Sequence, residues 1–153
     1  VNIGGPYSAF LPIAECPRFI DKNNIEEFAG VGDMLNSKIF GVKKGGIDLT
    51  LRSRGLGILE GGRIIKINPH KVPRVIGKEG SMINLIKNKT KTEINVGQNG
   101  IIWLNGEIEG EKKAEEAINL IAQEATHERL TEKIEEFLGK WKIIELYWQV
   151  KTA

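Results

Sequence analysis

Hydrophobic positions between residues 63 and 90 switch from strand spacing to helix spacing. The segment Arg63–Ile67 is predicted as a strand, and Pro73 stands where a short helix begins, since proline is favoured in the first turn of a helix. An apolar face then recurs at helical spacing, formed by Met82, Ile83, Leu85 and Ile86. This face predicts a second helix from about Ser81 to Lys89.

Two more strands and two more helices complete the pattern. Thr92–Gly97 and Ile101–Asn105 are predicted strands, joined by a turn at Asn99-Gly100, a dipeptide typical of tight hairpins. A longer helix is predicted from the spacing of Ala114, Ala117, Ile118, Ile121, Ala122 and Ala125. A last helix, from about Thr131 to Lys140, is predicted from Leu130, Ile134, Phe137, Leu138 and Trp141. The order is therefore strand, helix, loop, helix, strand, strand, helix, with an extra C-terminal helix.

The first 62 residues have a different, mostly β pattern. Strands are predicted at Tyr7–Ile13, Asp33–Val42 and Ile47–Arg54, with a short helical turn at Ile25–Phe28. Alternation in the third strand places Ile47, Leu49 and Leu51 on the core face. Short strands between glycine turns favour a small barrel, of which three strands are visible. If the barrel is of the five-stranded OB type, its opening strands lie upstream of Val1.

The two patterns divide the chain into two predicted domains, residues 1–62 and 63–153. The glycine-rich connection between them, Gly55-Leu56-Gly57 followed by Gly61-Gly62, is short. The fold class is predicted as α+β, a partial OB-fold β-barrel followed by a βααββα domain with a C-terminal helix. The chain opens on Val-Asn-Ile rather than methionine, so we expect a piece of a longer protein.

A Gly-x-x-Gly motif, Gly77–Gly80, lies between the two short predicted helices. Eighteen glycines in 153 residues produce roughly two such motifs by chance, so the context has to decide. The other match, Gly97–Gly100, falls in the predicted hairpin turn. Gly77–Gly80 instead precedes a helix and lies near Lys71, Arg74 and Lys78, which is the layout of the loop that clamps the nucleic-acid backbone in KH domains. We therefore predict a type I KH domain.

The charge distribution supports this prediction. The net charge is only +2, but residues 66–108 contain seven basic and three acidic side chains, whereas residues 109–153 contain seven basic and ten acidic ones. A basic segment around the motif is typical of a polyanion-binding surface. The alternative is an ordinary solvated face.

Other features narrow the class of protein. No apolar run approaches the ~20 residues that a membrane span needs, and no signal peptide is present. Cys16 is the single cysteine, so an intrachain disulfide is excluded and an intracellular, cytoplasmic setting is favoured. Cys16 itself is predicted to be a small buried hydrophobic residue. The aromatic tail Trp141–Trp148 is predicted either to pack on the domain or to dock a partner.

Longer motifs in series resemble one known family. Residues 72–78, 80–83 and 96–103 are similar to the KH domain of the archaeal exosome RNA-binding cap subunit, and Pro6–Pro12, Val31–Asp33 and Arg54–Gly57 are similar to the ribosomal S-one type OB domain that precedes it. The resemblance covers nearly all of residues 1–140 in the right order.

The resemblance implies a non-catalytic subunit of the exosome, an RNA degradation and processing complex. Three such caps on a phosphorolytic ring would gather single-stranded RNA and direct its 3′ end into the channel, with no membrane and no small-molecule substrate involved. By match to the family motif, the predicted phosphate contacts are Gly77, Lys78 and Gly80, with Lys71 and Arg74 as flanking charges. Glu79 adds a negative charge inside the clamp, so a KH domain that serves assembly with little RNA binding remains an alternative.

Further RNA contacts are predicted on both domains. The floor of the KH groove would come from Val75, Ile76, Ile83, Ile86 and Ile94, although each also fits a plain core position. On the barrel, the candidate phosphate contacts are Lys43, Lys44, Arg52 and Arg54.

We predict no catalytic centre, metal site or cofactor. His70 and His127 lack partners at metal-ligand spacing, the Glu pairs at 115/116 and 135/136 fit polar helix faces, and Trp103 fits the sheet packing. Two alternatives differ in class. In a NusA-like transcription factor, KH domains also come after an OB barrel. That family has two KH domains, however, and they are of the other KH topology. An enzyme with a nucleotide-binding glycine loop would need a phosphate-loop or dinucleotide fingerprint, which the sequence lacks.

Overall fold

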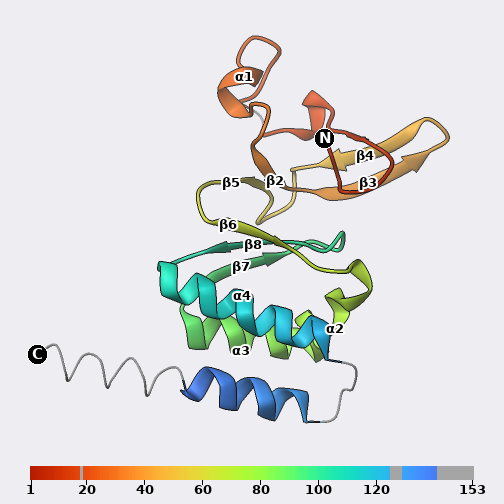
Figure 1. Cartoon of the computed structure of the whole chain (residues 1–153). Helices are drawn as coiled ribbons and strands as arrows, with labels where there is room; N and C mark the ends of the chain where they lie inside the picture. The colour runs from red at the N-terminus through yellow and green to blue at the C-terminus, as the bar shows by residue number, and fades with distance from the viewer. Residues whose placement is uncertain (18, 125–128, 141–153) are drawn as a thin grey trace, which may run out of the picture. The chain divides into compact units, whose positions relative to one another are not determined.

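The computed structural model of the chain describes residues 1–17, 19–124 and 129–140, and divides into two compact units, Val1–Gly61 and Gly62–Ala153. The fold is α+β (Figure 1). Each unit has its own sheets and is described separately.

The second unit has the element order predicted from the sequence. It contains β6 (Arg63–Lys66), α2 (Val72–Ile76), α3 (Ser81–Thr90), β7 (Glu93–Val96), β8 (Ile101–Asn105) and α4 (Ile108–Gln123), with short 3₁₀ turns η2 (Pro69–Lys71) and η3 (Lys78–Gly80). Residues 130–140 form the predicted C-terminal helix. The aromatic tail, His127 and Ala125 lie outside the described residues.

The sheet of this unit is antiparallel in the order β6-β8-β7. Helices α2, α3 and α4 cover one of its faces, and residues 130–140 lie on the far side of α3 and α4 from the sheet (Figure 1). Alternation in the strands directs Ile65, Ile102 and Leu104 into the helices, because period-two spacing sends every second side chain to the same face. The core also includes Val75, Ile86, Ile118 and Ile121 from the helices, and Leu130, Ile134 and Leu138 from the last one.

The hairpin turn is as predicted. The Gly100 N–H donates to the Gly97 carbonyl at 3.0 Å, and Gly100 has φ 82°. A Cβ at Gly100 would lie 2.2 Å from the carbonyl oxygen of Ile67, so this position requires glycine for space as well as for conformation. The second Gly-x-x-Gly motif is therefore a structural turn.

A glycine in α4 provides a test of the close packing between helices. A Cβ at Gly110 would lie 2.6 Å from the Thr90 carbonyl oxygen and 3.0 Å from Thr92 Oγ1, whereas a Cβ at Gly139 in the last helix would meet nothing within 4 Å. We expect Gly110→Ala to lower the free energy of unfolding by about 2 kcal/mol, because the added methyl overpacks the contact with the end of α3.

Gly139→Ala is the matched control. It should raise the free energy of unfolding by about 0.5–1 kcal/mol, because alanine is the better helix former. Urea unfolding followed by tryptophan fluorescence measures both. Equal effects of the two substitutions would contradict the close contact at Gly110.

The first unit differs from its predicted strands. It contains β1 (Ala9–Phe10), η1 (Ile13–Glu15), α1 (Ile25–Phe28), β2 (Met34–Asn36), β3 (Lys38–Lys43), β4 (Gly46–Thr50) and β5 (Gly57–Leu59). The sheets are β1-β4-β3 and β2-β5, with β1 parallel to β4. The helical turn Ile25–Phe28 is confirmed, and Cys16 is buried as predicted.

Three strand predictions in this unit were wrong in extent. The first predicted strand keeps only Ala9–Phe10, and the second is broken at Ser37 because its halves pair in different sheets. The third ends at Thr50, where the Leu51 N–H turns away to donate to the Glu15 carbonyl at 3.0 Å. Strand β5 was missed, since three residues among glycines carry little pattern of their own.

Candidate nucleic-acid interface

The Gly77–Gly80 loop joins α2 to α3 through an unusual backbone path. Helix α2 ends where the Gly77 N–H donates to the Pro73 carbonyl at 3.0 Å, and Gly77 itself has φ 75° and ψ 174°. The Gly80 N–H then donates to the Gly77 carbonyl at 3.2 Å, and Gly80 is left-handed at φ 77°. The loop thus turns sharply and delivers the chain to the N-terminus of α3, where the positive end of the helix dipole favours an anion.

The two glycines of this loop serve different purposes. A Cβ at Gly77 would lie 2.7 Å from both the Cβ and the backbone nitrogen of Met82, so this glycine is needed for the loop to pack on α3. A Cβ at Gly80 would meet nothing closer than Asn84 Nδ2 at 3.5 Å. The space over Gly80 is open, so another backbone could approach there.

The two charged residues between the glycines are both exposed. Glu79 is held at φ 53°, a conformation uncommon for residues other than glycine, asparagine and aspartate. Within the described residues, Lys78 and Glu79 form no ion pair with each other or with any other side chain. The Lys78 ammonium is therefore available to a ligand, with Glu79 as an opposing charge in the same loop.

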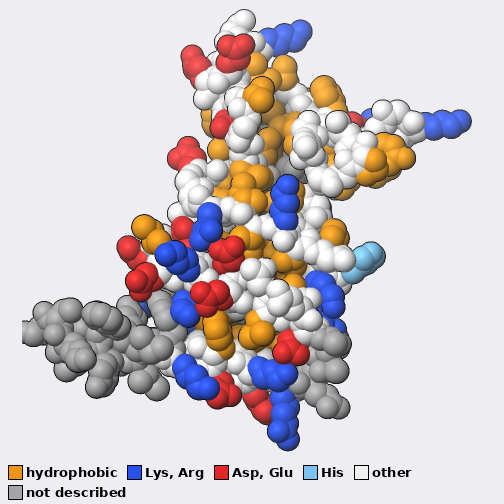
Figure 2. Space-filling view, viewed as in Figure 1, with side chains coloured by type: hydrophobic (Ala, Val, Ile, Leu, Met, Phe, Trp, Pro, Cys, Tyr) orange, Lys and Arg blue, Asp and Glu red, His pale blue; other side chains and the backbone are white. Residues whose placement is uncertain are grey.

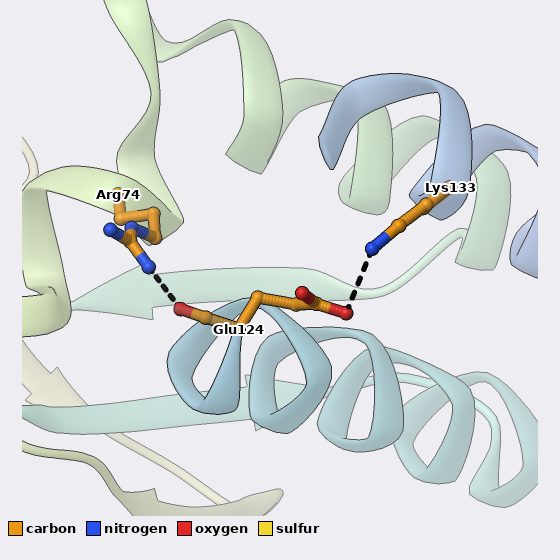
Figure 3. A network of polar contacts seen from close by, with 3 residues as sticks. All are labelled: Arg74, Glu124 and Lys133. Carbon is orange, nitrogen blue, oxygen red and sulfur yellow. Dashed lines mark hydrogen bonds and ion pairs between the residues drawn. The ribbon is translucent and has the colours of Figure 1, made fainter. Parts of the chain in front are cut away.

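Arg74 is directed toward the C-terminal end of α4 (Figure 3). Its guanidinium donates to the backbone carbonyl of Glu124, the residue that caps the C-terminal end of α4 (Figure 3). The Glu124 carboxylate pairs in turn with Lys133 of the last helix at 3.2 Å. Arg74 therefore links α2 to α4, a structural role that the sequence did not reveal, while its role as a flanking charge for RNA stays a prediction.

Lys71 and Asn84 flank the loop from its two sides. Lys71 ends η2, immediately before α2, and is half-buried. Asn84 lies in the first turn of α3, exposed, with its side-chain amide beside Gly80. Asn84 was not predicted from the sequence. Its position four residues after Gly80, one helical turn along, is the signal that could have revealed it.

Four of the five predicted groove-floor residues are core residues. Val75, Ile83, Ile86 and Ile94 are buried, and Ile76 is half-buried. Trp103 is only 6% exposed, in the middle of β8, so its ring is not free to stack on a base. Val75, Ile83, Ile86 and Ile94 are thus occupied by the packing of this unit's own core.

The four candidate phosphate contacts predicted in the first unit occupy two places. Lys43 ends β3 and lies 2.8 Å from Asp48, and the hydrogen bond to that carboxylate, together with its charge, raises the pKa of Lys43. Lys44 is exposed in the adjoining turn. The predicted strand Ile47–Arg54 included Arg52 and Arg54, and this was wrong, because both are exposed beyond the end of β4. The Arg52 N–H donates to Thr50 Oγ1 at 3.1 Å, a local bond typical of a turn.

The remaining candidates for chemistry are separate from one another. His70 is exposed in η2, Glu115 pairs with Arg63, and Glu136 pairs with Lys140. Among the described residues, no three His, Cys, Asp or Glu side chains converge in a way that could hold a metal ion. In the same residues, no helix is long and apolar enough to cross a bilayer.

Figure 2 shows how charge is distributed over the visible face. Lysine and arginine side chains are interspersed with acidic ones on the helical part of the second unit, while acidic side chains gather around α1 in the first. The excess of positive charge in residues 66–108 therefore does not form one continuous basic surface on this face.

Known proteins similar to this chain share both units. Residues 62–120 match the KH domain family. The exosome complex component Rrp4 of Thermoplasma acidophilum is 41% identical over 93% of this chain, and that of Methanothermus fervidus is 45% identical over 90%. The chain spans 61% and 62% of the length of these two relatives. A crystal structure described as an exosome complex RNA-binding protein superposes with a TM-score of 0.79 at 33% identity, covering 93% of this chain and 84% of that one.

Proposed function

Because the chain belongs to the family of archaeal exosome components named Rrp4, we propose that it is a non-catalytic, RNA-binding cap subunit of an exosome. In this role it binds single-stranded RNA and directs the 3′ end to the phosphorolytic ring subunits, which carry out 3′-to-5′ degradation. The ring subunits are its protein partners, and the cytoplasm is its place of action.

The observation that carries this proposal is the loop at Gly77–Gly80. Its backbone is open over Gly80, it opens directly onto the first turn of α3, and the ammonium of Lys78 is unpaired within the described residues. These features suit a phosphate, which takes hydrogen bonds from backbone amides and a charge from a nearby cation. In the proposed complex, Gly77 shapes the loop, Gly80 allows the close approach, Lys78 and Lys71 supply charge, and Asn84 donates from its amide.

The first unit has an accessory role in the proposal. We assign it to the carboxyl-terminal part of an OB-fold domain of the ribosomal S-one type, consistent with its two small sheets and short α1. Lys44, Arg52 and Arg54 are exposed and contribute phosphate contacts. Lys43 contributes less, because RNA would have to compete with Asp48 for its ammonium.

RNA binding is expected to be dominated by backbone electrostatics and therefore to depend on salt. In a titration of a fluorescent oligoadenylate, Lys78→Glu should weaken binding about tenfold at low salt and reduce the slope of log K against log salt by about 1. Fluorescence anisotropy at several salt concentrations measures both quantities. Gly80→Asp should weaken binding by a comparable factor, since it places a carboxylate in the open space over the loop while aspartate tolerates the left-handed backbone.

Lys112→Glu is the matched control for Lys78→Glu, because it makes the same charge change on the exposed side of α4, away from the loop in sequence. It should change the affinity by less than about twofold. Equal weakening by the two reversals would contradict a site at the loop and indicate only a nonspecific response to net charge.

Glu79 supports a second candidate function, a KH domain that serves mainly in assembly. An exposed carboxylate inside the loop repels phosphate. Under the RNA-binding proposal, Glu79→Gln should strengthen oligoadenylate binding by about threefold. If the wild-type chain and this variant both fail to bind while remaining folded, the assembly function is favoured.

A further inference from the structure

The first unit contains a hollow beside α1 that the RNA-binding proposal does not use. Its volume is about 380 Å³, and its lining includes Phe19, Phe28, Ile58, Glu27 and Glu60. The rings of Phe19 and Phe28 meet edge to face, with centroids 6.5 Å apart and an interplanar angle of 78°. Phe19 is 72% exposed, so much of its ring is open to a ligand.

The loop that carries Phe19 is fixed by hydrogen bonds of its own. Asn24 Nδ2 donates to the Phe19 carbonyl at 2.7 Å, and Asn24 Oδ1 accepts from the Asp21 N–H at 2.7 Å. The Asn23 N–H donates to Asp21 Oδ1, also at 2.7 Å. The backbone that carries Phe19 is therefore ordered before any ligand arrives, which lowers the entropy cost of binding.

The charge around the hollow is negative. Glu27 and Glu60 are both exposed, and within the described residues neither forms an ion pair. Residues 19–33 contain four acidic side chains and one lysine, and acidic side chains gather around α1 in Figure 2. A phosphate backbone would be repelled here, whereas a cation would be attracted.

The combination of aromatic rings and carboxylates selects among cations. A guanidinium is planar, stacks on an aromatic face and donates two parallel hydrogen bonds to a carboxylate. An ammonium can lie over a ring, as Lys113 does over Phe137 at 5.1 Å, but it is not planar and offers no such pair of parallel donors. We propose that this hollow binds an arginine side chain presented by a segment of a partner protein, with Phe19 and Phe28 against the guanidinium and Glu27 and Glu60 at its edges. This site is separate from the RNA-binding loop and does not depend on it.

The proposal is tested by NMR titration of the 153-residue chain with a capped Gly-Arg-Gly peptide. The chain carries Arg18→Ala, so that no arginine next to Phe19 in the sequence competes. We expect millimolar binding with backbone amide shifts concentrated at Phe19–Ile20, α1 and Ile58–Glu60. The same peptide with citrulline, which keeps the shape and loses the charge, should produce no saturable shifts.

Substitutions show whether the peptide binds in the hollow itself or is attracted only by the acidic charge around it. Glu27→Gln and Glu60→Gln should each weaken binding about threefold, and the double substitution about tenfold, in the range of exposed ion pairs. Phe19→Ala should weaken it by a similar factor. Glu26→Gln is the matched control, because Glu26 lies next to Glu27 on α1 and does not line the hollow; it should leave the affinity within about twofold.

Three results would overturn the proposal. The first is equal shifts with the arginine and citrulline peptides, and the second is equal weakening by Glu26→Gln and Glu27→Gln. The third is an oligoadenylate that shifts the same amides more strongly than the peptide, which would make the hollow a nucleic-acid site instead. None of these depends on whether the Gly77–Gly80 loop binds RNA.

Discussion

Replacing Gly77 by alanine is expected to lower the free energy of unfolding by about 3 kcal/mol, and the same change at Gly80 by about 1 kcal/mol or less. Gly77 has φ 75° and ψ 174°, a region essentially restricted to glycine, and its added Cβ would lie 2.7 Å from Met82 Cβ and backbone nitrogen. Met82 is buried against the core, so it has little room to move. Strain and overpacking therefore act together at this position.

Gly80→Ala is the matched control for this prediction. Its left-handed backbone costs about 1–2 kcal/mol for alanine, which the reduced freedom of the unfolded chain partly offsets. Its Cβ would meet no atom closer than 3.5 Å. Urea unfolding followed by tryptophan fluorescence measures both variants. Similar losses at the two positions would show that α3 shifts to accept the methyl at Gly77.

Replacing Ile134 by alanine should lower the free energy of unfolding by about 2–4 kcal/mol. This is the second of the two largest expected effects. Leu130, Ile134 and Leu138 recur every four residues on one face of the last helix, and all three are at most 5% exposed within the same core as the sheet and the other helices. Removing the buried side chain loses its transfer free energy and leaves a cavity. The helix at 130–140 is in this sense part of the core of the second unit.

Glu135→Ala controls for a general loss of helix stability, because Glu135 is exposed beside Ile134. It should change the free energy of unfolding by less than about 0.5 kcal/mol. Thermal unfolding by circular dichroism is a convenient check. If Ile134→Ala costs no more than Glu135→Ala, the last helix is not stably packed on the domain in solution.

The second unit could be predicted from its sequence because local signals agreed with one another. Pro73, the Asn99-Gly100 turn and the apolar face of Met82, Ile83 and Ile86 each indicate the element that the structure contains. The strands of the first unit could not be predicted in the same way, because they are short and their ends depend on hydrogen bonds to residues far away in the sequence. Thr50 ends β4 because Leu51 bonds to Glu15, which lies far away in the sequence.

The sequence also located the candidate RNA-binding loop. It did not indicate which of the predicted contact residues have side chains available to a ligand. The spacing of Gly77 and Gly80 and the nearby basic residues are local properties, fixed by the order of the amino acids. Whether a side chain is available is not a local property. Arg74 is engaged by Glu124, Lys43 by Asp48, and Lys78 by no side chain within the described residues, and only the tertiary fold decides between these outcomes.

The sequence by itself thus determined the order of elements in the second unit, the position of its glycine loop and its α+β class, because these follow from periodicity and turn chemistry within a few residues. The tertiary structure decided where the strands of the first unit end, which of the two loop glycines is needed for packing, and which rings and carboxylates meet beside α1. Phe28 and Glu60 lie 32 positions apart in the sequence, and folding brings both to one hollow. Contacts of that range depend on the packing of whole elements, and no local pattern encodes them.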